Sequence, residues 1–141
     1  MTRTRPDYYY TQSAVIPYRQ RDGALQVLMI TSRKKRHWIV PKGIKEPELS
    51  PQASAAKEAL EEAGIEGRVS ERPIGSYRYR KWGGTCTVEV FTMAVDEVHP
   101  TWDESYRDRE WVPLEAAVAR IENRDLKALL RALPAFLHEA G

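Results

Sequence analysis

The stretch Gly43–Ile65, GIKEPELSPQASAAKEALEEAGI, decides the fold of this chain. Its second half predicts a helix with clear signals at both ends. Ser50 is a favoured N-cap residue, and Pro51 suits the first helical position. Gly64 suits the position where a chain leaves a helix with positive φ. The sequence therefore predicts an alanine-rich helix between Pro51 and Gly64.

This helix carries three carboxylates, Glu58, Glu61 and Glu62, which share one face because they are spaced at i, i+3 and i+4. The opposite face, expected to be the core side, holds Ala56, Leu60 and Ala63. Like charges at this spacing repel by about 0.2–0.5 kcal/mol per pair. A solvated acidic face is one interpretation. A bound hard cation is the other, because Mg²⁺ and Mn²⁺ take clustered oxygen ligands.

The loop before the helix contains Pro41, Lys42 and Gly43, and a glycine there allows the backbone to approach a ligand closely. With this loop, the stretch resembles the Nudix box, the signature of hydrolases that cleave nucleoside diphosphates linked to another group. The positions that match the box are Gly43, Glu58, Glu61, Glu62, Gly64 and Ile65, with Ala59 in an aliphatic position.

Two positions depart from the pattern of the box. Leu49 stands where the family has a glutamate, and Lys57 stands where it has an arginine. In the family, these two residues are understood to brace the loop against the helix. This chain alters the brace and keeps the metal set, and Glu46 or Glu48 could replace the missing acid.

The resemblance implies an α/β fold, a Nudix-type α/β/α sandwich with a mixed β-sheet between helices. We expect a single domain over residues 12–141, preceded by an N-terminal arm over residues 1–11. The resemblance also implies Mg²⁺ or Mn²⁺ as cofactor. The expected metal-binding residues are Gly43, Glu58, Glu61 and Glu62, and the expected catalytic residues are Glu58, Glu61 and Glu104. Asp103 is the second choice for the loop acid that completes the metal site or acts as base.

Four consecutive cations, residues 33–36, precede the short apolar segment that leads into the box. They could be solvated surface, or they could clamp phosphates, arginine in bidentate fashion and lysine as a point charge. The segment SYRYRKW alternates aromatic and basic residues, as in a strand with one basic face. The candidate substrate-binding residues are Arg33, Lys35, Arg36, Lys42 and Arg78.

The remaining chain predicts a hairpin at residues 13–31 with Asp22-Gly23 as its turn, and a long hairpin at 73–95 with Gly83-Gly84 as its turn. Two helices are expected, over 114–121 and 126–137. Pro17 is expected to confine its strand to an end or an edge, and Pro134 to break or kink the last helix. The Tyr-rich arm is expected to pack along an edge, although stacking on a base is the alternative.

The composition of the chain excludes several classes of protein. The chain has 141 residues, a net charge of +2 and one cysteine, Cys86, which excludes an intramolecular disulfide. The N-terminal residues MTRTRPDYYYTQ lack a signal-peptide core, and no apolar run reaches the ~18–20 residues that span a bilayer. We expect a cytoplasmic protein without a membrane partner, for which nucleic acid is an unfavoured ligand. The oligomeric state is open, with a homodimer among the options.

Within the family, WIVPKG, the basic run and WDES…REWVPLEAA resemble the diphosphoinositol polyphosphate and diadenosine polyphosphate phosphohydrolases. The resemblance therefore implies metal-dependent hydrolysis of a phosphoanhydride bond in a nucleoside or inositol polyphosphate, with a substrate like a dinucleoside polyphosphate favoured. Two alternatives stay open. One is a catalytically weak Nudix module that binds nucleotide, and the other is an RNA 5′-pyrophosphohydrolase.

Overall fold

The computed structural model describes residues 2–140 of the chain. Met1 and Gly141, the outermost residues of the predicted arm and domain, lie outside the described residues. In chain order the elements are η1 (Asp7–Tyr10), β1 (Thr11–Arg21), β2 (Ala24–Thr31), β3 (Trp38–Ile39), β4 (Lys42–Ile44), α1 (Pro51–Ala63), β5 (Ile65–Val69), β6 (Gly75–Lys81), β7 (Gly84–Val98), β8 (Arg109–Pro113), α2 (Leu114–Arg120) and α3 (Arg124–Ala140).

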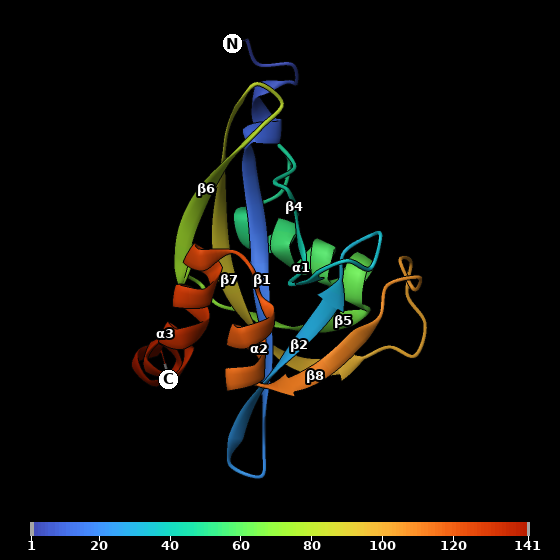
Figure 1. Ribbon diagram of the computed structural model, residues 1–141, viewed down its shortest axis with the longest axis vertical. Helices are drawn as coiled ribbons and strands as arrows, with labels where there is room; N and C mark the ends of the chain where they lie inside the picture. Colours follow the sequence, from blue (N-terminus) through green and yellow to red (C-terminus); the bar gives the residue numbers. More distant parts are fainter. Residues whose placement is uncertain (1, 141) are drawn as a thin grey trace.

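An eight-stranded sheet forms the middle layer, with the order β3-β2-β1-β7-β5. β4 pairs with β1, β6 with β7, and β8 with β2. The pairing of β1 with β7 is parallel, whereas β1 pairs with β2 and with β4 in antiparallel fashion. The prediction of a mixed sheet is therefore confirmed. Figure 1 shows β1 running along the middle of the molecule.

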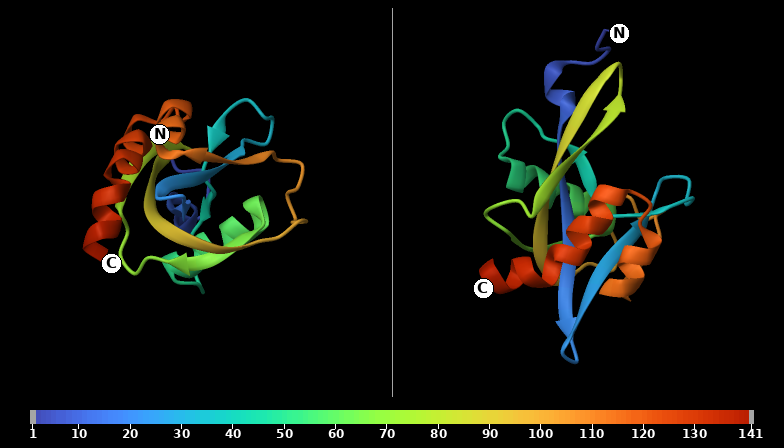
Figure 2. Two further views of the ribbon diagram at one scale, coloured as in Figure 1. Left: turned by 90° about the horizontal axis from the view of Figure 1, so that it is seen from below. Right: turned by 60° about the vertical axis from the view of Figure 1, so that its left-hand side comes forward.

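Each face of the sheet has its own hydrophobic core. One core joins the strands to α1 through small residues of the helix, and its sheet side consists of Val15, Leu28, Ile30, Ile65, Phe91 and Met93. The other core joins the strands to α2 and α3, and its sheet side includes Ala14, Ile16, Val27, Met29, Val88 and Val90. Figure 2 shows α1 and the α2–α3 pair on opposite sides of the sheet. This arrangement is the predicted α/β/α sandwich.

Two tight turns close the two long hairpins. Asp22 and Gly23 both have positive φ, 53° and 78°, as a two-residue hairpin turn requires. The second turn lies one residue earlier than predicted. Its positive-φ residues are Trp82 and Gly83, and Gly84 already belongs to β7.

The expectation that Pro17 restricts its strand to an end or an edge was wrong. β1 lies inside the sheet, and Pro17 is aligned with Met93 of β7. On its other side, β1 pairs with β4 over Gln12–Ala14 and with β2 over Tyr18–Arg21. Pro17 falls in the gap between these two partners, where a strand can lack an N–H donor without losing a ladder bond.

The two C-terminal helices form as predicted, but Pro134 does not break the second one. α3 is continuous from Arg124 to Ala140 with Pro134 inside it. Leu130 and Leu133 are fully buried against the sheet, and this packing offsets the hydrogen bond that a proline removes. None of the helices in residues 2–140 combines the length and the apolar character that a bilayer span requires.

The N-terminal arm packs against the turn between β6 and β7, as Figure 1 shows. Tyr10 is buried, and its hydroxyl donates a hydrogen bond to the backbone oxygen of Trp82. The ring of Tyr9 meets the ring of Trp82 edge-on, with centroids 5.4 Å apart. The arm therefore packs against the sheet, as predicted, but at the tip of a hairpin rather than along an edge.

Candidate active site

The helix α1 has the predicted ends. The hydroxyl of Ser50 accepts a hydrogen bond from the backbone N–H of Ala53 at 3.0 Å, and Pro51 follows the cap. Gly64 has φ +66°, and its backbone N–H bonds to carbonyls of the last helical turn. These caps fix where the helix begins and ends, and therefore which side chains face the loop before it.

The core side of α1 differs from the prediction. Ala55, Ala59 and Ala63 are fully buried in the core, whereas Leu60 is 41% exposed. The prediction was therefore wrong for Leu60, whereas Ala63 lies in the core and Ala56 packs against it as predicted. Three alanines let the helix lie close to the sheet, and this close approach buries the neighbouring Glu62, which is only 7% exposed.

The first glycine of the box lies directly against a carboxylate of α1. A Cβ atom built on Gly43 would stand 2.2 Å from Cδ of Glu58 and 2.5 Å from each of its carboxylate oxygens. Any side chain at this position would require the carboxyl group of Glu58 to move. β4 and the middle of α1 therefore bring a backbone segment and a carboxylate together, as the sequence predicted for these two residues.

Burial raises the pKa of two of the glutamates. Desolvation, followed by the neighbouring Glu58, raises the pKa of Glu62 from 4.5 to about 9. Desolvation also raises the pKa of Glu58, to which the charges of Glu61 and Glu104 contribute. Within residues 2–140, no lysine, arginine or histidine forms an ion pair with Glu58 or Glu62. A buried and a half-buried carboxylate beside a backbone loop, unpaired with any basic side chain of the described residues, fit a hard divalent cation.

Glu104, the predicted loop acid, lies next to the carboxylates of α1. The backbone N–H of Glu104 donates to the carbonyl of Glu61 at 3.0 Å. One carboxylate oxygen of Glu104 accepts hydrogen bonds from Nη2 of Arg107 at 2.8 Å and from its Nε at 3.0 Å. Arg107 is 5% exposed, and its Nη1 bonds to the carbonyl of Thr31. Asp103, the second choice, is exposed.

Two further side chains, Trp102 of this loop and Arg109 at the start of β8, bond to the end of α1. The indole N–H of Trp102 donates to the carbonyl of Glu62 at 3.0 Å, and Nη1 of Arg109 donates to the carbonyl of Ala63 at 2.7 Å. The guanidinium of Arg109 lies 3.8 Å from the ring centroid of Trp102. Trp102, Arg107 and Arg109 were not predicted from the sequence, because the backbone carbonyls that they bond to carry no sequence signal of their partner.

An ion pair between Lys57 and Glu46 takes the place of the brace that the family pattern has and this chain lacks. Nζ of Lys57 lies 2.9 Å from both carboxylate oxygens of Glu46. The backbone N–H of Glu46 also donates to the hydroxyl of Ser54 on α1. Of the two acids that could replace the missing one, Glu46 is therefore the one in contact. Leu49, which follows Glu46 by three residues, is half-buried.

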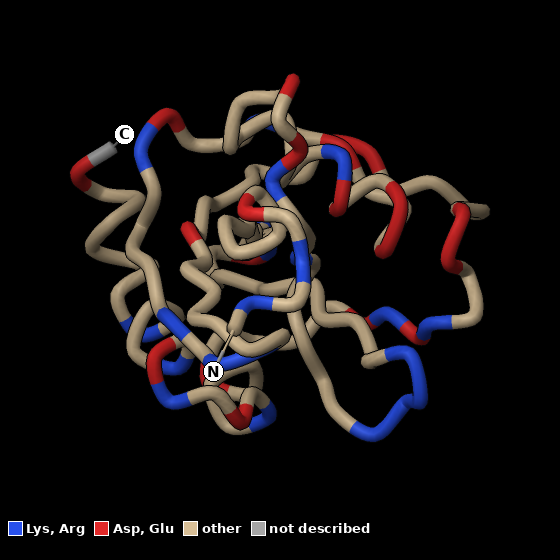
Figure 3. Tube along the Cα trace, turned by 90° about the horizontal axis from the view of Figure 1, so that it is seen from above, with Lys and Arg blue, Asp and Glu red and all other residues tan. Residues whose placement is uncertain are grey.

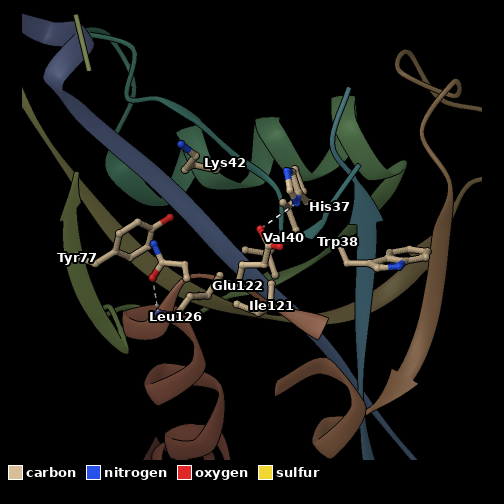
Figure 4. Close-up of a pocket in the computed structure, with 10 residues that line it drawn as sticks. His37, Trp38, Val40, Lys42, Tyr77, Ile121, Glu122 and Leu126 are labelled. Carbon is tan, nitrogen blue, oxygen red and sulfur yellow. Dashed lines mark hydrogen bonds and ion pairs between the residues drawn. The ribbon is translucent and has the colours of Figure 1, made fainter. Parts of the chain in front are cut away.

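Lys42 precedes Gly43, but its side chain lies on the other face of the sheet. Its Nζ bonds to Tyr79 at 2.9 Å and to Gln12 at 3.2 Å, and burial lowers its pKa. Lys42 lines a cavity of about 250 Å³ together with Trp38 and Tyr77, shown in Figure 4. The structure thus places this predicted substrate-binding residue beside a cavity rather than beside the carboxylates.

The other predicted substrate-binding residues lie on the surface. Arg33, Lys35 and Arg36 are exposed in the loop between β2 and β3. Nζ of Lys35 lies 3.4 Å from Asp108, one residue after Arg107. In Figure 3 this basic loop and the acidic loop before β8 lie on the same side of the molecule.

Arg78 is an exposed residue of β6. The neighbouring residues of this strand, Tyr77 and Tyr79, pack against the core beneath α2 and α3. Side chains alternate along a strand, so Arg78 lies on the face of the sheet that α1 covers. It makes no side-chain ion pair within the described chain.

A different cluster meets the spacing of a preformed metal site. Within the described part of the chain, one group of three possible ligands has all its atoms within 4.8 Å, and it consists of Glu66, Glu97 and His99. The carboxylates of α1 do not satisfy this spacing. A cation at α1 would therefore require rotation of these side chains.

Comparison with known proteins identifies the family. A model of the NUDIX domain matches residues 10–133, so the chain belongs to the Nudix family. It is 33% identical to diphosphoinositol polyphosphate phosphohydrolase 3-alpha of Mus musculus over 121 residues, which cover 83% of this chain and 73% of that protein. It is 32% identical to the chloroplastic Nudix hydrolase 21 of Arabidopsis thaliana over 124 residues, 83% of this chain.

Solved structures show the same fold. The Ap4A hydrolase of C. elegans, in a binary complex, superposes with a TM-score of 0.78 at 23% identity, covering 92% of this chain and 98% of that one. The chain spans 62% of Nudix hydrolase 21 and 54% of the mitochondrial Nudix hydrolase 13 of Arabidopsis thaliana. The predicted family and the predicted Nudix fold are thus confirmed.

Proposed function

We propose that this chain is a metal-dependent hydrolase of phosphoanhydride bonds in a nucleoside or inositol polyphosphate. One observation carries the proposal. The carboxyl group of Glu58 lies against Gly43, and beside it Glu62 is buried without a cation from the described chain. Burying acids in this way is costly unless a ligand neutralises them.

The cation would be Mg²⁺ or Mn²⁺, because carboxylate and carbonyl oxygens are the donors available. Glu58, Glu61, Glu62 and the backbone carbonyl of Gly43 would hold it. When bound, it supplies charge withdrawal from the diphosphate and lowers the pKa of a water molecule. The names of similar proteins, which include an Ap4A hydrolase and diphosphoinositol polyphosphate phosphohydrolases, support this class of substrate.

Residues of the chain would perform the remaining steps. Glu58 or Glu104 accepts the proton of the attacking water. Arg107 orients Glu104 by occupying one of its carboxylate oxygens, which leaves the other free to accept. Glu61 contributes to the same charged face, and its pair with Lys57 is long, at 4.0 Å.

Basic residues would neutralise phosphates beyond those at the cation. The exposed cations Arg33, Lys35 and Arg36 lie next to the loop that carries Glu104 and Arg107. Each further phosphate adds negative charge, so nearby cations favour long polyphosphates over short ones. We therefore favour a dinucleoside polyphosphate over a sugar-linked diphosphate. Arg78 and Lys42 are proposed to contact more distant parts of the substrate.

The brace between Glu46 and Lys57 supports an enzyme over a module that only binds nucleotide. The departures at Leu49 and Lys57 were the argument for a weakened site, and the contact between Lys57 and Glu46 restores a link between loop and helix.

The predicted cytoplasmic location and the oligomeric state remain expectations.

The experiment is a substrate panel. Diadenosine tetraphosphate, a diphosphoinositol polyphosphate and ADP-ribose would each be incubated with the protein, with Mg²⁺ and with EDTA, and the products separated by chromatography. We expect Mg²⁺-dependent cleavage, fastest for the substrates with more phosphates. Absence of cleavage of all three compounds, together with a ligand-induced rise in the melting temperature, would instead support a binding module.

A further inference from the structure

The last turn of α1 is bonded by the segment that leads from β7 into β8, residues 99–109, which we call the capping loop. The backbone N–H of Glu104 donates to the carbonyl of Glu61 at 3.0 Å. The indole N–H of Trp102 donates to the carbonyl of Glu62, also at 3.0 Å. These two carbonyls belong to glutamates whose side chains are part of the proposed cation site. The capping loop therefore holds the backbone of that site directly.

Arg109 and His99 continue this series of hydrogen bonds. Nη1 of Arg109 donates to the carbonyl of Ala63 at 2.7 Å, and the backbone N–H of His99 donates to the carbonyl of Gly64 at 2.8 Å. Nη2 of Arg109 donates to the carbonyl of His99 at 2.6 Å, which joins the two ends of the capping loop. The last carbonyls of a helix have no partner within the helix and are commonly bonded by water or by a short cap. Here one loop bonds four consecutive carbonyls, from Glu61 to Gly64.

The capping loop also packs closely against the end of α1. A Cβ atom built on Gly64 would stand 2.7 Å from Cβ of Trp102 and 2.8 Å from Nη1 of Arg109. The guanidinium of Arg109 lies 3.8 Å from the ring centroid of Trp102. The indole and the guanidinium therefore form one layer over Gly64, and a shift of either side chain would break a hydrogen bond to α1.

The other side of the capping loop is anchored to the end of β2. Nη1 of Arg107 donates to the carbonyl of Thr31 at 2.9 Å, and the backbone N–H of Asp108 donates to the hydroxyl of Thr31, also at 2.9 Å. The backbone N–H of Thr31 donates to the carbonyl of Asp108 at 3.0 Å. Glu104 lies between the two anchors, with its backbone on α1 and one carboxylate oxygen on Arg107. Its carboxylate therefore has a fixed place relative to the glutamates of α1.

We propose that Trp102 and Arg109 are positioning residues, which fix the capping loop on α1 so that the carboxylate of Glu104 stands beside the carboxylates of the helix. The inference rests on the proposed function, because Glu104 is one of the two acids that accept the proton of the attacking water there. Helix stability alone does not require this arrangement, since the N–H of Gly64 already caps the helix through its bonds to Ala59 and Leu60. Exposed loops are otherwise among the most mobile parts of a protein, and a misplacement of about 1 Å can cost about a hundredfold in rate.

The first test is turnover of diadenosine tetraphosphate with Mg²⁺ by Trp102→Phe, which removes the indole N–H and keeps an aromatic ring beside Arg109. We expect kcat to fall at least about tenfold while KM stays within about twofold of the wild type. Trp111→Phe is the matched control and should keep wild-type turnover. Trp111 is half-buried on β8, and within residues 2–140 its indole N–H bonds to no group of α1. A Trp102→Phe variant with wild-type kcat overturns the proposal.

A double variant separates positioning from a general loss of stability. If Trp102 acts through Glu104, replacing it should cost little in a chain that already lacks this carboxylate. Trp102→Phe combined with Glu104→Gln should therefore turn over within about twofold of Glu104→Gln alone. A double variant that is slower than Glu104→Gln by the full factor of Trp102→Phe overturns the proposal.

Amide hydrogen exchange followed by NMR tests the same inference without any turnover. The N–H of Glu104 is protected by its bond to Glu61, so a loosened loop should exchange it faster. We expect at least about tenfold faster exchange in Trp102→Phe and in Arg109→Lys, whose single ammonium replaces a guanidinium that bonds two carbonyls, and no change in Trp111→Phe. Unchanged exchange of Glu104 in either variant overturns the proposal. If the wild type cleaves no phosphoanhydride but exchange is faster in both variants, the proposed function fails and the inference that the capping loop fixes Glu104 stands.

Discussion

Replacing Glu62 with glutamine should inactivate the enzyme and stabilise its metal-free form. Glutamine has the same shape but no charge, so it removes a cation ligand and also the cost of burying an acid. The wild-type side chain is 7% exposed, and burial beside Glu58 raises its pKa from 4.5 to about 9. Stability and activity should therefore change in opposite directions.

The sign of the pH dependence follows from the raised pKa. Between pH 4.5 and 9 the folded chain keeps a proton on Glu62 that the unfolded chain has released. The free energy of unfolding of the metal-free protein therefore falls as pH rises through this window. At pH 8, which is 3.5 pH units above the ordinary pKa of 4.5, this loss of stability amounts to at most about 5 kcal/mol, at 1.36 kcal/mol per unit.

The assay is thermal unfolding in EDTA at pH 5, 6, 7 and 8. We expect Glu62→Gln to gain at least about 1 kcal/mol over the wild type at pH 8, or about 3–4 °C for a chain of this size, and almost nothing at pH 5. Added Mg²⁺ should stabilise the wild type more than the variant. Glu48→Gln, an exposed acid of the preceding loop, is the control. A gain that is independent of pH, or a loss at pH 8, refutes the reasoning.

Three further substitutions test other parts of the site. Gly43→Ala should lower kcat at least tenfold, because its methyl group would overlap the carboxyl group of Glu58; wild-type turnover would contradict this contact. Arg107→Gln should cost roughly 3 kcal/mol in urea unfolding, because it leaves the loop carboxylate without its buried partner, and a cost below 1 kcal/mol would contradict that role. Replacing Arg33 and Arg36 with glutamine should lower kcat/KM for diadenosine tetraphosphate more than for ADP-ribose and weaken its salt dependence. An unchanged ratio between these two substrates would identify the loop as solvated surface.

The local signals in the sequence were sufficient for α1 and for the carboxylates on it. Ser50, Pro51 and Gly64 act within a few residues of themselves, so the helix ends could be predicted without knowledge of the fold. The spacing of the glutamates fixed their common face for the same reason. The first hairpin turn likewise depends only on the φ angles of Asp22 and Gly23.

Features that depend on distant partners could not be predicted in this way. An alanine-rich helix offers several equivalent stripes, and only the sheet beneath it decides that Ala59 is buried and Leu60 exposed. Pro17 is tolerated because its strand changes partner at that residue, which no local pattern records. The hydrogen bonds from Trp102 to Glu62 and from Arg107 to Thr31 join segments 40 and 76 residues apart, so no local pattern predicts them.

Turnover by Glu58→Gln tests the central claim most directly. The claim is that the carboxylates of α1 beside Gly43 hold the cation at which a phosphoanhydride is hydrolysed. The measurement is kcat on diadenosine tetraphosphate at saturating Mg²⁺, with circular dichroism to verify the fold and Glu48→Gln as matched control. The claim predicts that Glu58→Gln loses at least a hundredfold in kcat while the control keeps wild-type turnover. A folded Glu58→Gln variant with kcat within threefold of the wild type would contradict it.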